Sequence, residues 1–224
     1  MVDKPGRRKK PKRPWGKVAA VVFVVLIIGG ASYYVYETYI YKAAPIYAEV
    51  YTSLGSFEIV LYPASAPKTV ANFVNLAEQG FYNNLTWHRI EKGFVIQIGD
   101  PNTRNGGGNR SLWGSDSSNT TVPFEYDPNL HNYAGYIAMA STAAKTGGSS
   151  QFYINLADNS ANLDGNYAVF GQVIQNMTVV NAIGSVPTES VTVPGGATQD
   201  EPVTPIFITS IVILGTSSTL ASTS

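Results

Sequence analysis

The feature that most constrains the fold is a series of short segments in which apolar and polar residues alternate. The first, IYAEVYTSLGSFEIVLY at residues 46–62, predicts two strands around a turn at residues 53–56, with Phe57, Ile59 and Leu61 on one face. Further strands are predicted at residues 87–90, 93–100, 135–140, 151–157, 167–174 and 206–214. Many short strands with few helices favour a mainly β fold, a barrel or a sandwich.

Helical periodicity is confined to two segments after residue 46. Residues 65–80 carry apolar residues at helical spacing, and we expect Ser65 or Thr69 to cap the start of this helix and Gly80 to end it. A shorter helix is predicted over residues 176–184, capped by Asn176 and ended by Gly184. The glycine-rich residues 99–121 lack the G-x-G-x-x-G spacing of a phosphate site and predict a surface loop, as do residues 187–205.

The N-terminal part predicts a membrane anchor. Residues 18–36 are uncharged, long enough for one helical crossing, and follow a strongly basic segment. The positive-inside rule then predicts a cytoplasmic tail at residues 1–17, a transmembrane signal-anchor at 18–36, a linker at 37–45, an extracytoplasmic domain at 46–215 and a Ser/Thr-rich tail at 216–224. A signal peptide cleaved near Gly29-Gly30-Ala31 and a buried soluble helix remain as alternatives.

Charge and residue usage exclude several classes of protein. From Lys42 onward, thirteen acidic residues stand against seven basic ones, so we expect no nucleic-acid partner. The absence of cysteine excludes disulfides, thiolate metal sites and thiol catalysis. His88 and His131 are the only histidines, and we interpret both as structural or surface residues. With no G-x-S-x-G, P-loop or H-E-x-x-H motif, we expect neither a metal nor a cofactor.

One arginine has no obvious structural purpose. Arg89 lies in TWHRIEKGFVIQIGDP, between strand-like residues and without an obvious acidic partner. On its own this pattern is typical of a surface residue of a strand, and the alternative is that the side chain faces a substrate.

A family likeness adds to this interpretation. The segments NFVNLAEQGFYNNLTWHRIEKGFVIQIGDP, FEYDPNLHNYAGYIAMA, SSQFYINLA and NYAVFGQVI resemble the cyclophilin-type peptidyl-prolyl cis-trans isomerases, in order and over about residues 46–214. The resemblance implies a closed eight-stranded antiparallel β-barrel with two capping helices. Asn162 and Tyr167 stand where many eukaryotic members have tryptophan and histidine, which makes the chain look prokaryotic-like. Because that tryptophan contacts cyclosporin, we expect no tight binding of the drug.

The resemblance also implies a site, residue by residue. It assigns catalytic roles to Arg89, Phe94 and Gln97. It assigns substrate binding to Val95, Met139, Ala140, Ser141, Gln151, Tyr153, Leu163 and Tyr167.

The implied activity is rotation of X-Pro bonds in exported polypeptides by a monomeric enzyme. Two alternatives remain from sequence: a non-catalytic chaperone or scaffold that binds Pro-containing peptides on the same barrel, and a solute or carbohydrate binder.

Overall fold

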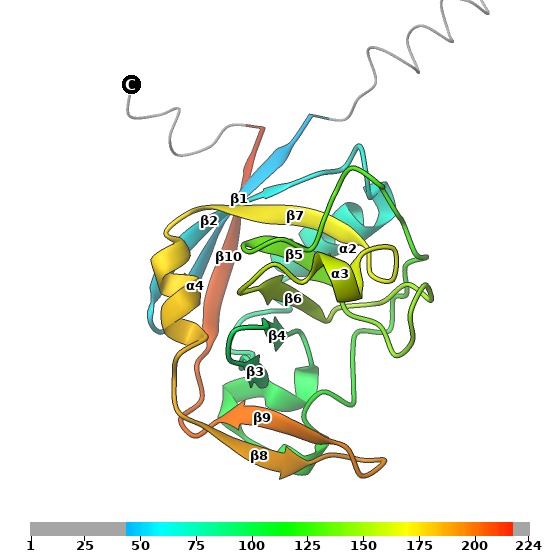
Figure 1. The fold of residues 1–224 in the computed structure, drawn as a ribbon. Helices are drawn as coiled ribbons and strands as arrows, with labels where there is room; N and C mark the ends of the chain where they lie inside the picture. Colours follow the sequence, from blue (N-terminus) through cyan, green and yellow to red (C-terminus); the bar gives the residue numbers. More distant parts are fainter. Residues whose placement is uncertain (1–43, 217–224) are drawn as a thin grey trace, which may run out of the picture. The chain divides into compact units, whose positions relative to one another are not determined.

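An eight-stranded antiparallel sheet forms the body of the protein in the computed structural model, which describes residues 44–216. The sheet has the order β10-β1-β2-β7-β5-β6-β4-β3 and curls around an apolar core (Figure 1). Its strands are β1 (Ile46–Thr52), β2 (Gly55–Leu61), β3 (Arg89–Glu91), β4 (Val95–Ile98), β5 (Tyr136–Met139), β6 (Phe152–Asn155), β7 (Val169–Gln175) and β10 (Ile208–Gly215).

The sheet is not a closed barrel, so that expectation is wrong. Strands β10 and β3 are its two edges, and no ladder joins them within residues 44–216. The chain just before each edge strand makes an isolated bridge between Thr86 and Phe207, and the Trp87 N–H donates to the Ile206 carbonyl at 2.9 Å. Strand β3 has three residues and packs against β9, which explains why it does not continue the sheet to β10.

The core follows from the alternation in the sequence. Phe57, Ile59 and Leu61 of β2 are buried together, as their period-two spacing predicted. Aromatic rings fill the centre: Phe73 lies 5.4 Å from Phe152 between ring centroids, and both are almost fully buried. Such rings bury a large apolar area each and prefer the tilted and edge-on contacts seen here.

Helix α2 (Pro67–Glu78) packs on this core and is capped in an unexpected way. Its N-cap residue is Ala66, which has no side chain to donate or accept a hydrogen bond. The carboxylate of Glu125 instead accepts hydrogen bonds from the backbone N–H groups of Lys68 (3.1 Å) and Thr69 (2.8 Å). The predicted cap from Ser65 or Thr69 is therefore wrong, because a carboxylate distant in sequence occupies that position.

The shorter helices lie elsewhere on the sheet. Helix α4 (Met177–Ile183) follows Asn176, which has a left-handed backbone conformation, and ends at Gly184 as predicted. The side chain of Asn176 makes no capping hydrogen bond, contrary to expectation. A four-residue helix, α3 (Ser160–Leu163), lies near β6 and β5 (Figure 1).

Two segments predicted as loops contain regular structure. Residues 99–121 include the 3-10 turns η2 (Pro101–Gly106) and η3 (Arg110–Leu112). Residues 187–205 include a hairpin, β8 (Thr188–Thr192) and β9 (Thr198–Pro202), which corrects the loop prediction. These strands are rich in polar residues, so their alternation carried little signal.

Arg110 joins the two segments. Its Nε lies 2.9 Å from the buried carboxylate of Glu201, its Nη2 donates to the carbonyl of Pro202, and its guanidinium lies over the ring of Trp113. The hairpin thereby gains a fixed position next to β3 (Figure 1).

The predicted tail at residues 1–17, the predicted anchor at 18–36, most of the linker at 37–45 and residues 217–224 lie outside the described residues. In the part that is described, no helix is long and apolar enough to cross a membrane.

Candidate active site

A pocket of about 270 Å³ gathers nine of the eleven residues that the resemblance assigns to the site. Its walls come from β3, β4, β6, the end of β5, helix α3 and the segment before β7. The lining residues are Arg89, Phe94, Val95, Gln97, Ala140, Ser141, Tyr153, Leu163 and Tyr167.

Strand register brings these distant residues together. Arg89 on β3 pairs with Gln97 on β4, Gln97 pairs with Tyr153 on β6, and Tyr153 pairs with Ala138 on β5. Because side chains alternate between the two faces of a sheet, this row lies on one face while Ile90 and its neighbours enter the main core.

Three groups surround the Arg89 guanidinium. Its Nη1 donates a long hydrogen bond of 3.5 Å to the side-chain oxygen of Gln97, and its carbon lies 5.8 Å from the centroid of the Phe94 ring. Its Nε lies 3.4 Å from a carboxylate oxygen of Glu91. The sequence therefore did contain an acidic partner, two residues along the same strand, which our interpretation missed.

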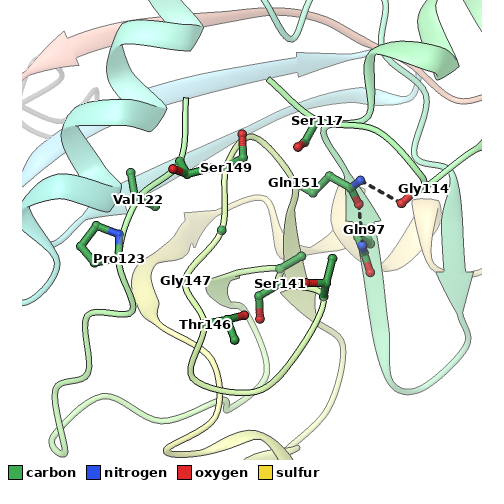
Figure 2. Close-up of a pocket in the computed structure, with 14 residues that line it drawn as sticks. Gln97, Gly114, Ser117, Val122, Pro123, Ser141, Thr146, Gly147, Ser149 and Gln151 are labelled. Carbon is green, nitrogen blue, oxygen red and sulfur yellow. Dashed lines mark hydrogen bonds between the residues drawn. The ribbon is translucent and has the colours of Figure 1, made fainter. Parts of the chain in front are cut away.

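Gln97 and Gln151 extend this contact into a chain of amides. The Gln97 amide nitrogen donates to the Gln151 oxygen at 2.8 Å, and the Gln151 nitrogen donates to the carbonyl of Gly114 at 3.0 Å (Figure 2). The Gln151 nitrogen also donates to the carbonyl of Asp116 at 2.6 Å. Each amide thus has a fixed orientation, so the oxygen of Gln97 points toward Arg89.

The floor of the pocket is apolar and rigid. Val95 and Tyr153 are 2% and 5% exposed and pack with Phe94, Leu163 and Tyr167 in a small cluster of their own. The rings of Tyr153 and Tyr167 meet edge-on with centroids 5.9 Å apart. Such a surface suits an apolar ring of the ligand.

A polar network behind the pocket holds Tyr153. Its hydroxyl donates to Asn132 at 2.9 Å, and burial raises the pKa of this phenol, so it remains a donor. Asn132 in turn donates to Asp164 from its backbone (2.8 Å) and side chain (3.0 Å). Partial burial opposes the charge on Asp164, but these bonds and His131 outweigh it and lower the pKa of its carboxyl. No sequence motif pointed to Asn132.

Met139 and Gln151 lie outside the small pocket. Met139 is 2% exposed and packs in the main core, because it alternates with Ala138 and Ala140 along β5. Gln151 lines a second, larger hollow of about 710 Å³ that shares Gln97, Ala140 and Ser141 with the small pocket.

The larger hollow is bounded by a close approach of two backbone segments. Gly147 has a φ of +78°, and a Cβ there would lie 2.1 Å from the carbonyl oxygen of Val122. Only glycine permits this approach, which brings Val122 and Ser149 to one side of the hollow and Ser141 and Thr146 to the other (Figure 2).

His88 lies fully buried next to Arg89 in the chain. Neither ring nitrogen has a hydrogen-bond partner among the described residues. Burial, together with the nearby charge of Arg89, lowers the pKa of His88 to about 3. The side chain of Gln151 favours the protonated ring and so raises this pKa, but its effect is smaller. Within residues 44–216, no group of three or more His, Asp and Glu side chains is placed to hold a metal ion.

Comparison with known proteins supports one family. A family model described as cyclophilin type peptidyl-prolyl cis-trans isomerase/CLD matches residues 47–213. The chain is 44% identical over 140 residues to peptidyl-prolyl cis-trans isomerase-like 1 of Aspergillus niger, covering 62% of this chain and 82% of the relative. It is 40% identical over 167 residues to peptidyl-prolyl cis-trans isomerase A of Dickeya dadantii, covering 73% and 82%.

Solved structures agree with the sequence comparison. A cyclophilin type peptidyl-prolyl cis-trans isomerase from Cryptosporidium parvum superimposes with a TM-score of 0.61 at 27% identity, over 75% of this chain and 97% of the other. A second structure of that protein, obtained in the presence of the dipeptide Ala-Pro, gives a TM-score of 0.60 at 29% identity, over 75% and 98%.

Proposed function

The chain belongs to the cyclophilin-type peptidyl-prolyl cis-trans isomerase family, and we propose that it performs this isomerisation by binding the twisted X-Pro amide between Arg89 and the apolar pocket. The barrier to rotation is about 18–20 kcal/mol, because amide resonance is lost as the bond twists. Catalysis therefore requires that the protein bind the twisted amide more tightly than either planar form.

Arg89 is suited to this task. In the twisted state the prolyl nitrogen becomes pyramidal and accepts a hydrogen bond, and a guanidinium is a permanent donor. The Arg89 side chain is 29% exposed and borders the pocket, so its donors can reach a bound peptide. No proton or electron is transferred, so the reaction needs no nucleophile.

The other residues hold the substrate. Phe94, Tyr153 and Leu163 contact the proline ring, and Gln97 orients Arg89. Gln151 and the backbone at Ala140 and Ser141 lie where the two hollows meet, and we assign the flanking peptide to them. Met139 supports this edge from the core. The observation that carries the proposal is the row Arg89–Gln97–Tyr153, which places a charged donor beside an apolar pocket.

Replacement of Arg89 tests the mechanism. We expect Arg89→Ala to lower kcat/KM for a Pro-containing peptide by about two to three orders of magnitude, as for loss of one preorganised donor. Exchange measured by NMR or a protease-coupled assay gives the rate, and circular dichroism verifies the fold. Arg104→Ala removes the same charge outside the pocket and should retain activity. Equal turnover by Arg89→Ala and the native protein would contradict the proposal.

We further propose that the isomerase is tethered outside the cytoplasmic membrane and acts on exported polypeptides. The uncharged residues 18–36 after a basic segment support this, and the family match begins only at residue 47. Asn162, next to Leu163, supports the expectation of weak cyclosporin binding.

A further inference from the structure

We propose that Glu91 makes this enzyme prefer substrates with a basic residue on one side of the proline. The inference rests on the proposed function of the Arg89 pocket and names the class of peptide that the pocket selects. Its starting point is the carboxylate next to Arg89, which the family resemblance did not assign to the site.

Glu91 lies on the same face of β3 as Arg89, because buried Ile90 separates them. Arg89 pairs with Gln97 and Glu91 pairs with Val95 across the β3–β4 hairpin. Gln97 lines both hollows, whereas Val95 lines only the small pocket. Glu91 is therefore placed on the flank of the proline pocket that faces away from the larger hollow. A peptide that leaves the pocket on this flank passes its carboxylate.

The Glu91 carboxylate is available to a peptide. Its side chain is 31% exposed, and within residues 44–216 its one ion pair is the 3.4 Å contact with Arg89 Nε. The Nη1 of Arg89 is directed to Gln97 instead. One carboxylate has room for about four hydrogen-bond donors, so Arg89 leaves most of that capacity unused.

Charges of both signs lie near this flank, so the sign of the preference depends on Glu91. Asp158 is fully exposed, and the next residue, Asn159, donates from its side chain to the carbonyl of Phe94 at 2.9 Å. Lys92 lies in the exposed hairpin turn and opposes the two carboxylates. Without Glu91, Arg89 and Lys92 would repel a basic residue. With it, the two carboxylates balance the two positive charges, and a lysine or arginine of the peptide on this flank can pair with the Glu91 carboxylate.

The size of the preference follows from exposure. Pairs of this kind in contact with solvent change an equilibrium by about two- to fivefold and weaken as salt screens them. We therefore expect kcat/KM for a Lys-containing peptide to exceed that for the matched Glu-containing peptide by about two- to fivefold at low ionic strength.

The test compares peptides on the same enzyme. Two sets of Ala/Pro peptides carry Lys, Gln or Glu at the second position before or the second position after the proline, and NMR exchange gives kcat/KM at low and high salt. The expected result is a Lys-over-Glu preference in one set that falls at high salt. The preference should fall close to one in Glu91→Gln and persist in Glu78→Gln, an equal change of charge on the exposed end of α2.

A second variant keeps the test independent of how well Glu91→Gln folds. Lys92→Gln removes the opposing charge and should increase the Lys-over-Glu ratio. Equal rates for the Lys and Glu peptides in the native protein, or a ratio unchanged in Glu91→Gln, would overturn the inference. Failure of the native protein to isomerise any of the peptides would instead contradict the proposed function, so the two failures are distinguishable.

Discussion

At the scale of the residue, His88 shows how burial next to an active-site charge affects stability. The imidazole is enclosed by the protein, and neither nitrogen has a partner within the described range. A neutral ring is tolerated there, whereas a protonated ring would be a buried charge next to the positive charge of Arg89, which Gln151 offsets only in part. Its pKa therefore falls from 6.5 to about 3 on folding.

This shift gives a pH dependence with a definite sign. Between pH 6.5 and about 3 the unfolded chain binds a proton at His88 that the folded protein does not bind, so the free energy of unfolding decreases as the pH falls through this range. Replacement by His88→Leu should reduce that slope by up to one proton, about 1.4 kcal/mol per pH unit. Urea unfolding at pH steps from 7 to 4 measures it. The carboxylates titrate in both proteins, so the difference between the two slopes isolates His88. If the free energy of unfolding had the same pH dependence in the native protein and in His88→Leu, the proposed pKa shift would be refuted.

At the scale of the element, helix α2 depends on a residue from another part of the chain. Glu125 accepts hydrogen bonds from two backbone N–H groups in its first turn, where the helix dipole also favours negative charge. Neither Ser65 nor Thr69 performs this role: the Ser65 hydroxyl donates to Asp127 at 2.6 Å.

Removing this cap should weaken the fold by a predictable amount. We expect Glu125→Ala to lower the free energy of unfolding by about 1 kcal/mol, the usual loss for a side-chain cap. Glu125→Gln retains an acceptor oxygen without the charge and should lose less. In chemical denaturation, the free energy of unfolding should be highest for the native protein, lower for Glu125→Gln and lowest for Glu125→Ala. An alanine variant as stable as the native protein would show that the contact does not cap the helix.

The same scale shows what the sequence can predict. Period-two alternation located β1 and β2, because alternate residues such as Ala48 and Val50 of β1 and Phe57, Ile59 and Leu61 of β2 are apolar and buried. The hairpin of β8 and β9 was missed since its strands are largely polar and its position depends on Arg110 and Glu201. Glu91 was visible at i+2 from Arg89, but the predicted strand ended at residue 90, whereas β3 includes Glu91 and so places both side chains on one face. The capping role of Glu125 depends on tertiary structure and leaves no local pattern.

At the scale of the whole molecule, the location of the enzyme remains a proposal with a direct test. In cells that produce the full chain, we expect the protein to remain with the membrane after an alkaline wash and to be digested by protease added to spheroplasts. If the wash releases the protein while added protease still digests it, the signal peptide has been cleaved. Full protection from the protease would contradict the proposed orientation.

Closure of the barrel was the main error at this scale. The family resemblance implied the right number of strands in the main sheet and their antiparallel pairing. Whether β3 and β10 pair with each other depends on whether their backbone N–H and C=O groups are free to form a ladder. Trp87 already donates to Ile206, ahead of β10, and β9 packs against β3. Such competition between neighbours cannot be inferred from the composition of either strand.

The pairing of β1 with β10 also has a consequence for how the protein is made. Tyr47 lies opposite Gly215, so the first strand of the domain to be synthesised borders on the last. Strand β2 can cover one side of β1 at once, but the other side stays without a partner until β10 has been synthesised. Long-range pairing of this kind folds slowly, and an open strand edge is a template for aggregation. An isomerase that acts on other chains therefore completes its own sheet only after the last strand of its domain has been synthesised.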